Sequence, residues 1–167
     1  MSTSTNPNAG LTARENPPLS GEAAPDFVLK DQDRNDWRLS EQVKQGDVVL
    51  CFFPMAFTAV CSTEMQCITQ EMDKWKKSGA QVVGVSCDSF AVLKAWADAT
   101  GLKQTLLADM HRSVCKAYGL YWADLNISGR GTVVIGHSPA GECKVKWSQK
   151  REIKQAMSFD EVLTHVS

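Results

Sequence analysis

The sequence predicts an α/β sandwich, in which helices flank a central mixed β-sheet and a hairpin lies at the N-terminal end of the fold. The first observation is the continuous apolar run Val48–Phe53, whose β-branched and aromatic residues are typical of a strand buried on both faces. The second is that strand and helix patterns alternate along the chain. The third is size: 167 residues with 43% apolar content indicate one domain that buries about 70% of its unfolded surface.

The individual elements follow from local patterns. Asp26–Lys30 and Asp36–Leu39 flank a polar turn and predict the hairpin, and Pro54 ends the strand Val48–Phe53. The later elements are a strand at Gln81–Ser86, a helix from Phe90 to about Gly101, a strand at Leu106–Leu107, a short helix that Asp109 caps and that runs through Tyr118, strands at Gly131–Ile135 and Glu142–Trp147, and a last helix at Phe159–Val166 capped by Ser158.

A helix is also predicted directly after the loop that follows the first long strand, from Ser62 to about Gly79. Apolar side chains recur along it at helical spacing, namely Met65, Ile68, Met72 and Trp75. Charged side chains interleave with them and predict its solvated face, namely Glu64, Glu71, Lys74 and Lys77.

The first twenty residues differ in composition from the rest. Residues 1–20 are rich in Ser, Thr, Asn and Pro and show no periodicity, so we expect a disordered tail there and a single domain over residues 21–167. A basic start followed by an apolar stretch is absent from the sequence, which disfavours a secretory signal.

Charge and cysteine usage narrow the functional class. The formal net charge is −1, so we expect neither nucleic acid nor a membrane surface as a partner. The six cysteines are irregularly spaced, and two of them, Cys51 and Cys143, fall in predicted strands. This pattern favours free thiols in a reducing cytoplasm over a disulfide framework. No close Cys-x-x-Cys or Cys/His pair exists, so no metal site is predicted.

Cys61 stands out because it lies where the apolar strand has ended and a helix begins. The unpaired N–H groups and the positive dipole end of a helix start favour the thiolate, which is the nucleophilic form of cysteine. In open α/β sheets the chemistry takes place at the carboxyl ends of the strands, which is where this loop lies. The sequence therefore predicts that Cys61 is a nucleophile in an active site.

The residues around Cys61 resemble a known family. Pro54, Thr58 and Cys61, in the spacing Pro-x-x-x-Thr-x-x-Cys, resemble the active-site motif of the peroxiredoxins. The resemblance covers most of the chain and includes the further segments Ala24–Phe27, Val85–Ser89, Lys116–Gly119 and Arg130–Ile135. It implies a thioredoxin-like fold. Within the family the chain looks closest to the short one-cysteine or AhpE-like forms, or to an atypical two-cysteine type, because no resolving cysteine follows in a carboxy-terminal arm.

The resemblance also implies roles for single residues. Cys61 matches the peroxidatic cysteine, which attacks a peroxide and becomes a sulfenic acid. Thr58 matches the threonine whose hydroxyl bonds the thiolate and the peroxide, and Pro54 the residue that shapes and shields the site. Arg130 matches the arginine that stabilises the thiolate and the leaving oxygen. Glu64 matches an acidic position that orients this arginine.

Three other cysteines are candidates for a resolving thiol. Cys67 lies six residues after Cys61 in the predicted helix, about 9 Å along its axis at ~1.5 Å per residue, so a disulfide between them requires unwinding. Cys87 follows a strand at the edge where the site is expected, and could approach Cys61 with less movement. Cys115 lies on a predicted helix. The alternative for each is a packed free thiol.

These features predict a thiol-dependent peroxidase that reduces hydrogen peroxide and organic hydroperoxides through a sulfenic acid, without a cofactor. The alternative is a peroxide-sensing thiol switch in which oxidised Cys61 alters a protein partner. The reductant is expected to be thioredoxin, glutaredoxin or a low-molecular-weight thiol. A homodimer is expected, with aromatic residues near Phe57, Tyr121 and Trp122 as a contact surface.

Overall fold

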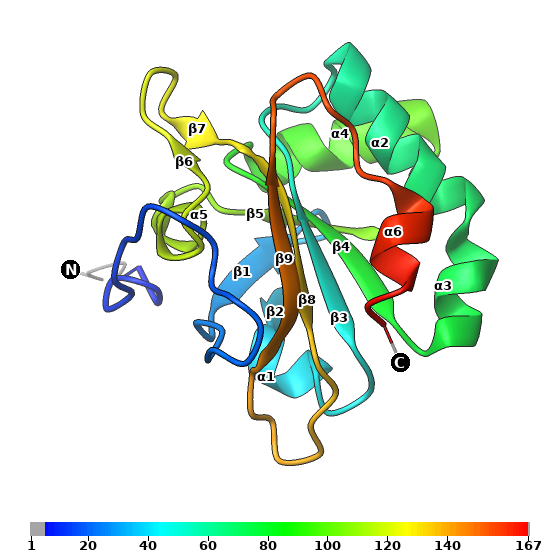
Figure 1. Cartoon of the computed structure of the whole chain (residues 1–167). Helices are drawn as coiled ribbons and strands as arrows, with labels where there is room; N and C mark the ends of the chain where they lie inside the picture. The colour runs from blue at the N-terminus through cyan, green and yellow to red at the C-terminus, as the bar shows by residue number, and fades with distance from the viewer. Residues whose placement is uncertain (1–5, 167) are drawn as a thin grey trace.

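A seven-stranded mixed sheet forms the centre of the computed structural model, which describes residues 6–166 (Figure 1). Its strand order is β2-β1-β5-β4-β3-β8-β9. The strands are β1 (Val28–Asp31), β2 (Asp36–Arg38), β3 (Val48–Phe52), β4 (Gln81–Ser86), β5 (Thr105–Ala108), β8 (Arg130–Ile135) and β9 (Val145–Arg151). Strands β3, β4 and β5 are parallel, and the remaining pairings are antiparallel, which confirms the predicted mixed sheet and N-terminal hairpin.

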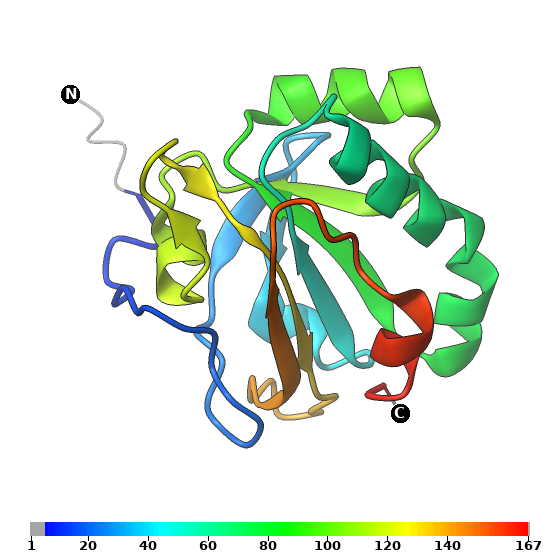
Figure 2. The same cartoon turned by 45° about the horizontal axis from the view of Figure 1, so that its top comes forward.

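Helices cover both faces of this sheet (Figures 1 and 2). One face carries α2 (Ala59–Gln70), α3 (Met72–Ser78), α4 (Phe90–Thr100) and α6 (Phe159–Leu163), and the other carries α1 (Leu39–Gln42) and α5 (Ser113–Ala117). Each face has its own apolar core. The predicted sandwich is therefore confirmed, and the sheet separates its two cores.

Strand β3 shows how the sequence produces this arrangement. Val48, Leu50 and Phe52 pack into the core shared with α5, whereas Val49 and Cys51 pack into the core shared with α2. Side chains alternate between faces along a strand, and every residue of β3 is fully buried. The continuous apolar run therefore meets the need for apolar side chains on both faces.

The predicted helix from Ser62 to Gly79 is two helices in the structure. Helix α2 begins earlier, at Ala59, and the chain breaks at Glu71 before α3 starts. A side chain from outside the helix contacts its last turns: Gln104 donates to the carbonyl of Met65 at 2.9 Å and accepts from the Thr69 hydroxyl at 2.6 Å. Local periodicity does not reveal such tertiary contacts.

Three further boundaries differ from prediction. Strand β9 begins at Val145 and continues to Arg151, so Cys143 precedes it, and helix α6 ends at Leu163. A two-stranded sheet of β6 (Tyr121–Trp122) and β7 (Ile127–Ser128) was not predicted. Its strands are too short to show a periodic pattern.

The expectation of a disordered tail is wrong for residues 6–20, while residues 1–5 lie outside the described part of the chain. Asn8 is buried, donating to the carbonyl of Val28 at 2.8 Å and accepting from the N–H of Val28 at 3.1 Å. Leu11 packs against the core, and the carbonyl of Pro18 accepts from the Ser148 hydroxyl at 2.7 Å. A few specific hydrogen bonds thus order a segment with few large apolar residues.

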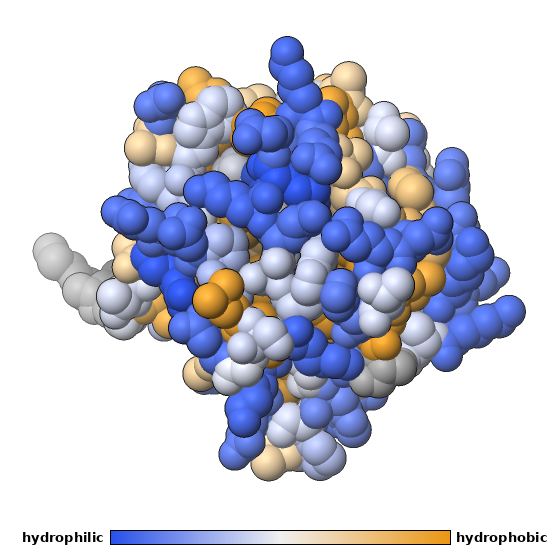
Figure 3. Space-filling model, viewed as in Figure 1, coloured by the Kyte–Doolittle hydropathy of each residue, from blue (hydrophilic) through white to orange (hydrophobic). Residues whose placement is uncertain are grey.

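The surface agrees with the balanced charge. The face seen in Figure 3 carries mostly hydrophilic and neutral residues, with hydrophobic ones scattered among them. Among residues 6–166, none of the helices has both the length and the hydrophobicity that crossing a bilayer requires.

Replacing Asn8 with Ala tests whether the N-terminal segment is docked. The substitution leaves the N–H and C=O groups of Val28 without their partner, so we expect the free energy of unfolding to fall by about 1–3 kcal/mol in urea titrations. Glu15→Ala, at an exposed position of the same segment, is the control and should change it by less than about 0.5 kcal/mol. Equal stability of the two variants would contradict the docking.

Candidate active site

Cys61 is the third residue of α2 and lies beyond the carboxyl end of β3. Its side chain packs in the core on the α2 face of the sheet, and the residue is only 1% exposed. The predicted position at a helix start is therefore confirmed, and the thiol is held in a largely dry environment.

The loop between β3 and α2 is fixed by polar contacts. Pro54 is buried, and the Thr58 hydroxyl donates to the carbonyl of Met55 at 2.8 Å. The N–H of Ala56 donates to the Asp88 carboxylate at 2.9 Å. Phe57 has a φ of 63°, a left-handed conformation that is uncommon for a large side chain. The surrounding structure therefore holds this loop in one conformation.

Arg130 brings a positive charge to Cys61 from the neighbouring strand. Strands β3 and β8 are antiparallel, so the first residues of β8 lie beside the carboxyl end of β3. From there Nη2 of Arg130 donates to Cys61 Sγ at 3.1 Å, and Nε donates to the carbonyl of Ile153 at 2.8 Å. Arg130 is 2% exposed, which reduces the screening of its charge by water.

Glu64 organises this cluster from one turn further along α2. Its Oε1 accepts from Nη1 of Arg130 at 2.9 Å, and its Oε2 accepts from Nη2 of Arg151 at 3.1 Å and from the N–H of Met157 at 2.6 Å. The expectation that Glu64 belongs to a solvated helix face is wrong, because its side chain is fully buried. The contact with Arg130 agrees with the orienting position that the family resemblance implied.

The charges of the buried ion pairs do not sum to zero. The side chains of Arg130 and Arg151 are each 1% exposed and share one carboxylate, so the three side chains sum to one positive charge. A buried charge without a counterion is costly. A thiolate on Cys61, in contact with Arg130, would supply the missing negative charge.

Cys51 completes the contacts of Glu64 and differs from Cys61 in character. Its thiol donates to Oε1 of Glu64 at 3.4 Å. Burial and the adjacent Glu64 carboxylate raise the pKa of Cys51 well above its ordinary value. Two cysteines close to one charged cluster thus have opposite environments: Cys51 faces a carboxylate and Cys61 a guanidinium.

An apolar pocket of about 270 Å³ opens onto Cys61. Four of the residues predicted from sequence line it, namely Pro54, Thr58, Cys61 and Arg130. The remaining lining comes from the loop before α2, the start of α2, the β6–β7 hairpin and the segment after β9, namely Met55, Ala59, Val60, Trp122, Leu125, Ile127, Ile153 and Lys154. The pocket is wide enough for a small organic molecule beside the thiol.

Several residues of the charged cluster and of the pocket were not found from sequence. Arg151 pairs directly opposite Arg130 in the sheet, but the predicted strand ended at Trp147 and left it out. Trp122, Leu125 and Ile127 belong to the hairpin that has no periodic signal. For Arg151, the available signal was its position at the end of β9, a strand that is half-buried along most of its length.

The three candidate resolving cysteines lie apart from this pocket. Cys67 is half-buried in α2, as predicted. Cys87 and Cys115 belong to the core on the opposite face of the sheet from Cys61, where their sulfur atoms lie 3.7 Å from each other. The structure therefore does not bring Cys87 or Cys115 to Cys61, because the side chain of Cys87 points to the α5 face.

Comparison with known proteins places this arrangement in a family. Residues 20–154 match the AhpC/TSA family. The chain is 32% identical over 120 residues to alkyl hydroperoxide reductase E of Mycobacterium tuberculosis, a match that covers 71% of this chain and 78% of the relative. It is also 32% identical over 128 residues to the chloroplastic 2-Cys peroxiredoxin BAS1 of Hordeum vulgare, covering 71% of this chain and 61% of that longer protein.

The solved structures agree. The reduced 2-Cys peroxiredoxin of Plasmodium vivax superposes with a TM-score of 0.78 at 28% identity, covering 88% of this chain and 79% of the other. A thioredoxin-like sheet with a cysteine at a helix start beside a buried arginine defines a thiol-based oxidoreductase. The chain belongs to the AhpC/TSA family and is a peroxiredoxin.

Glu64→Gln tests the buried cluster. The amide keeps the shape but removes the charge that Arg130 and Arg151 share, so we expect the free energy of unfolding to fall by about 3 kcal/mol in urea titrations. Glu71→Gln is the matched control: Glu71 pairs with the exposed Lys74 in the same region and should cost less than about 1 kcal/mol. A loss as small as that of the control would show that Glu64 does not hold the cluster together.

Proposed function

We propose that this protein is a thiol-dependent peroxidase that reduces hydrogen peroxide and organic hydroperoxides through a sulfenic acid on Cys61. The observation that carries the proposal is the 3.1 Å contact between Arg130 Nη2 and Cys61 Sγ at the base of an apolar pocket. The family membership supports the same reaction class.

The first step is attack of the Cys61 thiolate on the terminal oxygen of the peroxide. A sulfur–oxygen bond forms as the oxygen–oxygen bond breaks, and the leaving oxygen takes a proton to become an alcohol or water. Arg130 stabilises the thiolate before attack and the negative charge on the leaving oxygen during it. Residues already present in the pocket supply these functions, so the step needs no prosthetic group.

The other pocket residues have positioning roles in this proposal. Pro54 limits access of water to the thiol. The Thr58 hydroxyl donates its hydrogen bond to the carbonyl of Met55, so the hydroxyl oxygen can accept a hydrogen bond from the peroxide. Glu64 holds Arg130 through Nη1 and leaves Nη2 directed at the sulfur.

Regeneration requires a second thiol to reach the sulfenic acid. Cys61 is 1% exposed, so we propose that the first turn of α2 opens after oxidation. Thioredoxin, glutaredoxin or a low-molecular-weight thiol then attacks from outside. Cys67 is the candidate for an internal resolving thiol, since it shares α2 with Cys61 and requires the same opening.

The homodimer and the cytoplasmic location stay predictions. Phe57 is 57% exposed and Leu125 is 54% exposed at the rim of the active site, which gives apolar area that a second copy would cover. Trp122 and Tyr121, the other aromatic residues of the predicted contact, are half-buried in β6.

Replacing Cys61 with Ser tests the nucleophile. The hydroxyl is similar in size but hardly ionises near neutral pH, so peroxide consumption should disappear while the circular dichroism spectrum is unchanged. The assay is a coupled peroxide assay with and without a thioredoxin system, and Cys143→Ser, remote from the pocket, is the control with normal activity. A single oxidation of Cys61 without turnover under any reductant would favour the thiol switch instead.

Arg130→Lys tests whether charge alone is sufficient. An ammonium group cannot contact Ile153, Glu64 and Cys61 together, as the guanidinium does. We expect the second-order rate constant for oxidation of Cys61, followed by stopped-flow tryptophan fluorescence, to fall about 10²-fold. Lys154→Arg, a charge-conserving change at the pocket rim, serves as the comparison and should leave the rate within a few-fold. An unchanged rate in Arg130→Lys would show that the reaction does not require the planar guanidinium group of Arg130.

A further inference from the structure

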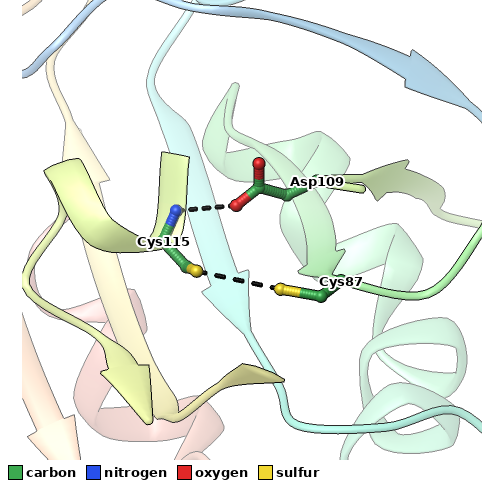
Figure 4. Close-up of side chains that lie close together, drawn as sticks. All are labelled: Cys87, Asp109 and Cys115. Atoms are coloured by element: carbon green, nitrogen blue, oxygen red, sulfur yellow. Dashed lines mark hydrogen bonds between the residues drawn. The ribbon is translucent and has the colours of Figure 1, made fainter. Parts of the chain in front are cut away.

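A second group of reactive side chains lies on the other side of the sheet from Cys61. Figure 4 shows Cys87, directly after β4, Asp109, directly after β5, and Cys115 of α5 pointing toward one another. The two sulfur atoms are 3.7 Å apart. All three residues are buried, and Cys87 is 8% exposed whereas Cys115 is fully enclosed.

Asp109 fixes the backbone of both cysteines. Its N–H donates to the carbonyl of Ser86 at 2.7 Å, directly before Cys87. Its carboxylate accepts from the N–H of Cys115 at 2.7 Å and from the N–H of Val114 at 3.2 Å. Asp109 thus links the two segments that carry the cysteines, and its hydrogen bonds hold their backbones close together.

We propose that Cys87 and Cys115 form a second redox site, independent of Cys61, that converts between a buried dithiol and an intramolecular disulfide. A disulfide has a sulfur–sulfur distance of about 2.0 Å, so the pair must close by roughly 1.7 Å. The two thiols are already in contact, which places the second one at high effective concentration once the first is activated.

The chemistry is thiol–disulfide exchange with a low-molecular-weight disulfide as oxidant. Cys87 attacks it as a thiolate, forms a mixed disulfide and releases one thiol; Cys115 then attacks the Cys87 sulfur and releases the second thiol. The protein loses two protons and two electrons, and the small disulfide gains both. Cys87 reacts first because it is the more exposed of the two cysteines. In addition, the hydrogen bond with Cys87 and burial raise the pKa of Cys115 well above its ordinary value.

Oxidation at this site has a path to the active-site loop. Cys87 is followed by Asp88, whose carboxylate accepts from the N–H of Ala56 and from the Ser86 hydroxyl. Drawing Cys87 toward α5 displaces Asp88 and loosens the loop that precedes Cys61. The disulfide is therefore expected to speed amide exchange at Ala56.

A metal ion is the competing ligand for the same three side chains. Both carboxylate oxygens of Asp109 already accept backbone N–H groups, and a structural zinc site normally has four protein ligands where this cluster supplies three. These contacts favour a Cys87–Cys115 disulfide over a bound metal ion.

The test uses Cys61→Ser, in which the peroxidatic chemistry is removed, so the result does not depend on the proposed peroxidase function. The folded protein is equilibrated with excess glutathione disulfide, remaining thiols are alkylated, and peptides are mapped by mass spectrometry. We expect a Cys87–Cys115 disulfide, loss of alkylation at both of these cysteines and faster hydrogen–deuterium exchange at Ala56.

Two control variants that each keep only one thiol of the Cys87–Cys115 pair give the comparison. In Cys61→Ser/Cys115→Ser, Cys87 should accumulate a glutathione adduct, while in Cys61→Ser/Cys87→Ser, Cys115 should stay reduced. Full alkylation of both cysteines after oxidation would overturn the proposal. So would stoichiometric zinc in the purified protein that the Cys115→Ser variant loses, since that result assigns the cluster to a metal.

Discussion

The shared carboxylate of Glu64 is the interaction on which the active site depends. It contacts α2 through its own backbone, β8 through Arg130, β9 through Arg151 and the segment before α6 through the N–H of Met157. Three parts of the chain that lie 66 to 93 residues after Glu64 are thus joined to α2 at one buried charge. Because two guanidinium groups share this single carboxylate, the cluster keeps one positive charge, and that charge faces the Cys61 sulfur.

The sheet controls what each thiol can do. Side chains alternate between its faces, so Cys51 and Cys61 lie on the α2 side, whereas Cys87 and Cys115 lie on the α5 side. On the first side, burial and the Glu64 carboxylate raise the pKa of Cys51, whereas the sulfur of Cys61 accepts a hydrogen bond from the Arg130 guanidinium. On the second, the sulfur atoms of two thiols contact each other at 3.7 Å. One residue type therefore has different chemistry in three environments of one small domain.

Most of the fold could be predicted from local patterns. Strand β4 and the start of α4 match their predicted positions, because an apolar run and the helical spacing of apolar residues are local features. The ordering of residues 6–20 could not be predicted, because it depends on hydrogen bonds with a remote segment at Val28. The break at Glu71 and the late start of β9 also left no signal in the local pattern. Glu64 shows the same division: helical spacing suggested an exposed position, and packing against β8 and β9 buried it.

The sequence by itself determined the class of chemistry: a cysteine after a strand and a proline loop, at the start of a helix, indicates a nucleophile, and these features all lie close together in the chain, from Val48 to Cys61. It also supplied Arg130 and Thr58 through family resemblance. Only the tertiary structure decided that Arg151 joins the cluster, that an apolar pocket opens on the thiol, and that Cys87 faces Cys115 rather than Cys61. Those outcomes depend on strand pairing and on which face of the sheet a side chain occupies, and both are fixed by long-range contacts.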